Sequence, residues 1–115
     1  MKSMKIILAG KNLLDLHTIE PDDYVNASFY VENNGDTSAR YWVKLYLDGD
    51  LYRQYQSTAL APGERSSAYN IHVYTDTKGS HTVVVEVNPF DTPVTDSVTD
   101  TFTVTEIPKV TKQDL

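Results

Sequence analysis

The sequence of 115 residues contains no cysteine. Disulfide bonds, thiolate catalysis and cysteine-ligated zinc or iron–sulfur sites are therefore excluded. It also lacks any run of about 20 apolar residues, the length that a membrane-spanning helix needs, so we expect no membrane insertion. The apolar run nearest the start, residues 6–8, is shorter than the ~7–15 residues of a signal-peptide core.

Basic residues are in the minority. Lysine and arginine together number 10 against 16 aspartates and glutamates, and the formal net charge is -6. A surface that binds the phosphates of a nucleic acid needs clustered basic side chains, whereas those of this chain are scattered among acids. We therefore expect no nucleic-acid partner.

Motifs of known enzymes are missing as well. The sequence has no nucleophile elbow, phosphate-binding loop or dinucleotide fingerprint, and its histidines, His17, His72 and His81, lack metal-ligand spacing. We therefore predict no catalytic residue, no cofactor and no metal site. Calcium takes about six to eight oxygens and no EF-hand pattern occurs, so turn formation is the favoured role of the loop aspartates, although calcium binding stays open. These aspartates are Asp22, Asp23, Asp48, Asp50, Asp91, Asp96 and Asp100.

The sequence does contain short segments in which apolar and polar residues alternate. Within 24–32, for example, Val25 and Phe29 belong to one apolar face, and this period of two is typical of a half-buried strand. The expected strands cover 24–32, 39–48, 51–58, 67–74, 81–87 and 97–105, and the turns between them include 33–36, 48–49, 60–64 and 76–79. A proline cannot donate a hydrogen bond within a sheet, so Pro89 and its neighbours predict a loop over 88–93.

The two ends of the chain are less regular. Residues 1–22 predict an irregular first strand that is broken or kinked at Gly10, with a helix over 11–16 as the less favoured alternative. Residues 108–115 are polar, and we expect a flexible tail there. The remainder, residues 1–107, is expected to form a single domain.

These elements predict an all-β fold, an immunoglobulin-like antiparallel β-sandwich of about seven strands in two sheets. A single sheet would leave one apolar face in water, whereas two stacked sheets bury the apolar residues of both. Each large apolar side chain that is buried contributes about 1.5–3 kcal/mol, so such a core can offset the chain entropy without disulfides.

Outward-facing aromatic residues are the sharpest functional signal. The predicted binding residues are Trp42, Lys44, Tyr46, Tyr55 and Val84. The first three share the outward phase of strand 39–48, and the last two would come from neighbouring strands, with Tyr52 as an alternative to Tyr55. Such a face suits burial against a protein partner or stacking on a sugar ring. Two alternatives stay open: the aromatics only cover neighbouring strands, or Trp42 turns into the core.

Four stretches of the sequence occur in the order typical of a known family. They are Val31-Glu32-Asn33-Asn34-Gly35, the segment 43–49 ending in Asp48-Gly49, Ala61-Pro62-Gly63-Glu64, and the alternating segment 79–87. With these features the chain resembles the CARDB domain, a cell-adhesion-related immunoglobulin-like module of bacterial and archaeal surface proteins. After Val87 it departs from the acidic, Asn-rich segment that many members have.

The resemblance implies a non-enzymatic structural or adhesion module. It would contact a protein partner, or associate with itself, through a sheet face or edge in a surface or secreted assembly. Two alternatives remain: a viral or phage structural protein, such as a capsid decoration or tail-associated domain, and a carbohydrate-binding module that uses the exposed aromatics. An extracellular or cell-surface location is expected from the resemblance, with a virion or an intracellular location still open.

Overall fold

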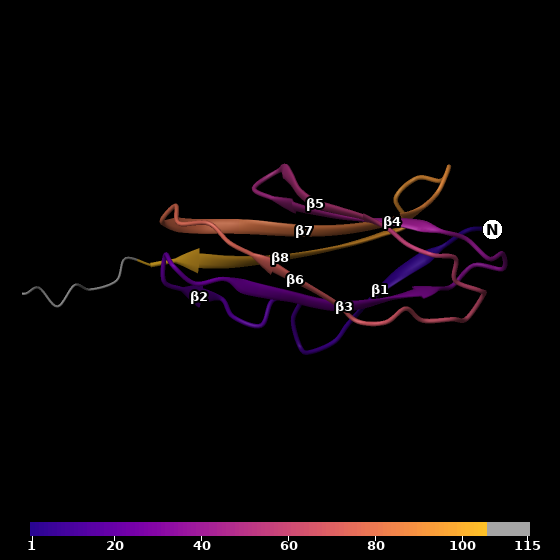
Figure 1. Ribbon diagram of the computed structural model, residues 1–115, viewed down its shortest axis with the longest axis horizontal. Helices are drawn as coiled ribbons and strands as arrows, with labels where there is room; N and C mark the ends of the chain where they lie inside the picture. The colour runs from indigo at the N-terminus through magenta and orange to yellow at the C-terminus, as the bar shows by residue number, and fades with distance from the viewer. Residues whose placement is uncertain (106–115) are drawn as a thin grey trace, which may run out of the picture.

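The computed structural model describes residues 1–105, which form eight β-strands and no helix. The strands are β1 (Met4–Leu8), β2 (Thr18–Ile19), β3 (Val25–Asn33), β4 (Tyr41–Leu47), β5 (Asp50–Gln56), β6 (Tyr69–Val73), β7 (Gly79–Pro89) and β8 (Asp96–Val104). They form a three-stranded sheet in the order β1-β3-β6 and a five-stranded sheet in the order β2-β8-β7-β4-β5, which Figure 1 shows as two stacked layers. Neighbouring strands are antiparallel except for the short parallel pair of β2 and β8. The expected all-β sandwich is confirmed, and the two-residue β2 is an additional strand. No helix within the described residues is long and apolar enough to cross a membrane.

The core lies between the two sheets and consists of the alternate side chains of each long strand that point inward. Along β3 every second residue is buried, and Phe29 near its centre is fully buried. The same alternation in β4 and β7 buries Val43 and Val85 opposite it. The other phase of these strands faces outward, so the alternation that builds the core also determines which side chains form the outer faces.

The expected loop over 88–93 is wrong at its start, because β7 continues to Pro89, which is paired with Tyr41 and buried. The next residue, Phe90, donates its backbone N–H to the carbonyl of Arg40 at 3.1 Å. Hydrogen bonding alternates along an antiparallel pair, so the nitrogen of Pro89 points away from β4. On that side β8 pairs with β7 only as far as Val87, so the proline costs no ladder hydrogen bond.

The start of the chain follows one side of β3 in two pieces. β1 pairs with the second half of β3, the chain then loops through Gly10, and Leu14 forms a bridge to Ala27 in the first half. Residues 11–16, where a helix was the alternative, contain no helical turn. The expected polar tail, 108–115, lies outside the described residues.

Candidate functional site

Most of the predicted binding residues gather on the outward face of the five-stranded sheet. Facing pairs on β4 and β7 are Trp42 with Asn88, Lys44 with Glu86, and Tyr46 with Val84. All six side chains are half-buried. The structure therefore brings Trp42, Lys44, Tyr46 and Val84 together, and Trp42 faces away from the core.

Tyr55 does not belong to this face. It pairs with Val43, which is fully buried, so Tyr55 points toward the space between the sheets. The cause is a β-bulge: Tyr46 pairs with Leu51 and Leu45 pairs with Arg53, which leaves Tyr52 as an extra residue in β5. An uninterrupted hairpin would place Tyr55 opposite Trp42, and the one-residue shift moves it to the other face.

Two residues of the face were missed in the sequence. Leu51 pairs with outward-facing Tyr46 and is 52% exposed. Phe90 follows β7 and stacks on Trp42, with ring centroids 5.3 Å apart. The two-residue hairpin at 48–49 places Leu51 opposite Tyr46 with or without the bulge, so the sequence could have identified Leu51. No local signal places a loop residue on an indole ring. We define the aromatic face as Trp42, Lys44, Tyr46, Leu51, Val84 and Phe90.

Charge on the aromatic face is balanced. The Lys44 ammonium lies 6.0 Å from the centroid of the Trp42 ring, and Glu86 is its partner across the strands. Burial and the neighbouring Glu86 carboxylate raise the pKa of the Tyr46 hydroxyl, so this phenol is neutral at physiological pH. Phe90 covers one side of the indole, so a partner can contact only the other face of the Trp42 ring.

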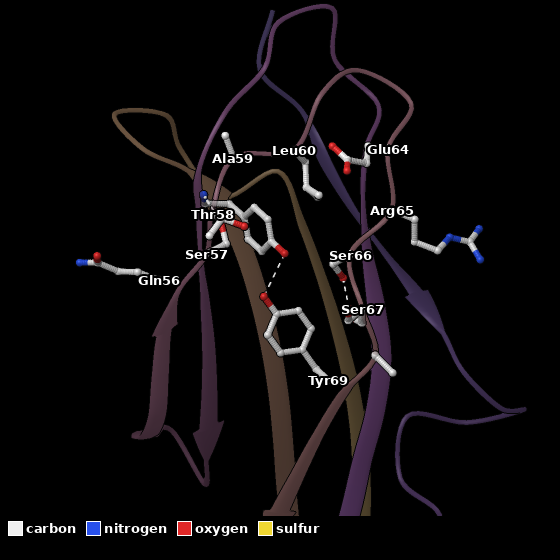
Figure 2. A pocket seen from close by; sticks show the side chains of 12 residues that line it. Gln56, Ser57, Thr58, Ala59, Leu60, Glu64, Arg65, Ser66, Ser67 and Tyr69 are labelled. Carbon is white, nitrogen blue, oxygen red and sulfur yellow. Dashed lines mark hydrogen bonds between the residues drawn. The ribbon is translucent and has the colours of Figure 1, made fainter.

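A second feature is a hollow of about 450 Å³ on the side where β5 and β6 leave the sandwich open (Figure 2). At its base the hydroxyls of Tyr41 and Tyr69 lie 2.9 Å apart in a hydrogen bond. Burial is the main cause, and this bond the second, of a strongly raised pKa of Tyr69. The charged residues of its rim are engaged elsewhere: Glu64 accepts the N–H of Ala61, and Arg65 points away and lies over the ring of Tyr30. The hollow is therefore neutral and polar, without a nucleophile paired to a base.

The histidines occupy three separate environments. His17 bonds to Asp100 at 2.9 Å, and exposed His72 stacks on Tyr24. Buried His81 bonds to the Asp48 carboxylate at 2.6 Å. Within residues 1–105 no three histidine, aspartate or glutamate side chains gather in a way that could hold a metal ion.

The CARDB family model matches residues 6–101. The chain belongs to the CARDB family. A search of curated proteins finds no sequence match to this CARDB domain.

Solved structures share the fold of this CARDB domain at low sequence identity. A CARDB domain from Pyrococcus furiosus, solved in complex with di-metal ions, is 14% identical with a TM-score of 0.66, and the match covers 91% of this chain and 88% of that one. The metal ions belong to that protein, and residues 1–105 of this chain contain no group of three side chains that could hold a metal ion.

Larger enzymes contain a domain of the same shape. A β-glucosidase from Erythrobacter marinus is 16% identical with a TM-score of 0.68, and one from Listeria innocua is 14% identical with a TM-score of 0.64. The matches cover 90% and 91% of this chain but only 16% of each enzyme. They show a shared fold and indicate no enzyme activity for this chain.

Proposed function

We propose that this CARDB domain is a non-catalytic structural or adhesion module that binds a protein partner through its aromatic face, within a surface or secreted assembly. The observation that carries the proposal is the exposed side chain of Leu51 beside the half-buried Tyr46 and Val84. An apolar patch of this kind on a sheet face is typical of an interaction surface.

The residues around the patch are polar, as expected at the rim of a protein–protein interface. On β8 the outward residues next to β7 are polar: Thr99 lies beside Val84, and Thr101 lies beside Thr82. Apolar and aromatic residues at the centre with polar residues around them are the usual arrangement of a protein–protein interface. Large aromatic side chains at such a centre commonly contribute 2 kcal/mol or more to binding, on the order of a 30-fold change in affinity.

Family membership supports the surface location. CARDB domains are often extracellular, and a module that only holds neighbours in place needs contact area and no reactive cleft. The neutral hollow of Figure 2 and the engaged histidines are consistent with this role.

Site-specific cross-linking tests the proposal. A photo-reactive amino acid at position 51, introduced in cells that produce the protein, should capture one or a few discrete proteins on illumination. The matched control is position 101, which is exposed on the same outward face but lies on β8 among threonines and serines. Equal capture at both positions, or none at position 51, would show that the aromatic face is not the contact surface.

A further inference from the structure

Four strands lie at sheet edges, and an open edge strand can pair with another chain. Two of these edge strands are short or capped within the described residues. β2 has only two residues. The free side of β1 is capped by side chains of the segment entering β8: Thr95 Oγ1 accepts the N–H of Met4 at 2.9 Å, and Asp96 Oδ2 accepts the N–H of Ile6 at 2.8 Å.

β6 is the remaining edge of the three-stranded sheet, and tyrosines of β5 lie against it. The ring of Tyr55 lies 6.4 Å from that of Tyr69, and the Tyr52 hydroxyl accepts the N–H of Tyr74 at 3.1 Å. β5 itself has β4 on one side and no described strand on the other. It is therefore an edge that residues 1–105 leave available for pairing.

The direction of the backbone groups on β5 follows from its bond to β4. Ser57 donates its N–H to the carbonyl of Tyr41 at 3.0 Å. Hydrogen bonding alternates along an antiparallel strand, so Tyr55 and Arg53 also bond to β4. The N–H and C=O groups of Gln54 and Gln56 then point out along the open edge.

Only part of β5 is protected against pairing. The bulge at Tyr52 twists the first half of the strand and interrupts its regular edge. The regular half and the residue after it, 53–57, read Arg-Gln-Tyr-Gln-Ser, with Arg53 as the one charged side chain and no proline among them. Tyr55 at its centre is 38% exposed.

We propose that this half of β5 pairs antiparallel with β5 of a second copy of the chain, about a two-fold axis at Tyr55. Gln54 then faces Gln56 of the second copy, and vice versa, which allows four main-chain hydrogen bonds between their outward groups. The two Tyr55 rings face each other at the closest type of cross-strand pair, over the opening beside Tyr69. The two five-stranded sheets become one continuous sheet.

The edge is self-complementary, which favours a second copy as the occupant: Gln54-Tyr55-Gln56 reads the same in both directions, so each glutamine meets a glutamine across the two-fold axis. The whole chain carries a net charge of -6, yet residues 53–57 carry a single charge, that of Arg53. In the symmetric register Arg53 faces Ser57 of the second copy, and the two arginines are four residues apart along the strand, roughly 14 Å. That separation exceeds the screening length of about 8 Å in physiological salt, so no like charges oppose one another.

A charge swap at the two-fold axis tests the proposal. Sedimentation of the wild-type chain from ~10 µM to ~1 mM, the range suited to a small interface, should show a mass that rises from 13.0 kDa toward twice that value. The variants Tyr55→Lys and Tyr55→Glu each place like charges at the axis and should remain monomeric. An equimolar mixture of the two places opposite charges there and should recover the dimer. Thr99→Lys, on exposed outer β8, should dimerise like the wild type.

Circular dichroism and thermal unfolding establish that each variant is folded. If the Tyr55 variants do not fold, Gln54→Pro replaces them, because it removes an outward N–H without removing a bond to β4. A wild-type chain that stays monomeric over the whole range, single variants that dimerise, or a mixture that does not recover the dimer would overturn the proposal. The edge is separate from the aromatic face, so each of these outcomes leaves the cross-linking result at position 51 unaffected.

Discussion

His81 is a buried polar side chain that joins three segments of the chain. Its Nδ1 bonds to the Asp48 carboxylate at 2.6 Å in the β4–β5 hairpin, and its Nε2 bonds to the carbonyl of Thr77 at 2.7 Å ahead of β7. Both partners are acceptors, so both ring nitrogens donate and the ring is an imidazolium when both bonds are made. Asp48 has a positive φ of 52° and also accepts the N–H of Thr82, so this charged pair holds the hairpin turn in place.

The charged pair predicts a stability that depends on pH. Burial lowers the pKa of His81, but the bonds to Asp48 and Thr77 outweigh it, and the net pKa is raised above 6.5. The stabilisation from the charged ring is thus complete below pH 6.5 and is lost as the pH rises through the folded-state pKa. The pKa of Asp48 is lowered below 3.8, with burial opposing the bond from His81, so its share is lost only in strong acid.

Thermal unfolding from pH 5 to pH 9 measures this effect. The wild type should lose stability across the upper part of that range. His81→Gln should cost about 1–3 kcal/mol at pH 5, because a buried bond to a charged group is removed, and should flatten the profile. Asp48→Asn, which keeps a residue that tolerates positive φ, should flatten it as well. A His81→Gln variant with the wild-type slope would contradict this role.

At the scale of elements, the first part of the chain depends on carboxylates of β8. Asp100 accepts the N–H of Leu14 at 3.0 Å and bonds to His17, and these bonds outweigh burial and lower its pKa. The carboxylate therefore holds the irregular segment after β1 against the five-stranded sheet.

Removing this carboxylate should release that segment. Asp100→Ala should destabilise the fold by about 1.5–3 kcal/mol, the usual cost of losing hydrogen bonds to a charged group, and should speed amide exchange at Leu14. Asp22→Ala, at an exposed turn, should change the stability by less than about 0.5 kcal/mol. Equal exchange rates at Leu14 in both variants would show that Asp100 does not hold the segment.

The sequence predicted the strands and the direction of several side chains, but it did not predict the register between strands. Alternation of apolar residues is a local property, and it sufficed to predict the six main strands and the outward phase of Trp42, Lys44 and Tyr46. The register between strands depends on both partners, and nothing in 50–56 alone signals that Tyr52 is a bulge. For that reason the sequence placed Tyr55 on the aromatic face. Leu51 lies before the bulge and faces Tyr46 in either register, so the hairpin turn could have identified it. Pro89 was misread because its missing N–H matters only if β8 pairs with it, and β8 begins at Asp96 opposite Val87.

At the scale of the whole molecule, the bulge divides β5 between two surfaces. Before it, Leu51 faces outward and extends the aromatic face. After it, Tyr55 turns toward the opening between the sheets and lies against Tyr69 at the free edge. One module can then contact a partner protein with its face and a second copy with its edge.

The register of β5 is therefore the claim on which both surfaces depend, and nuclear Overhauser contacts between side chains measure it directly. The structure predicts contacts of the Tyr55 ring with the Tyr69 ring, and of the Leu51 methyl groups with Tyr46. Contacts between the Tyr55 and Trp42 rings, with none to Tyr69, would show a regular hairpin without the bulge and would contradict the account.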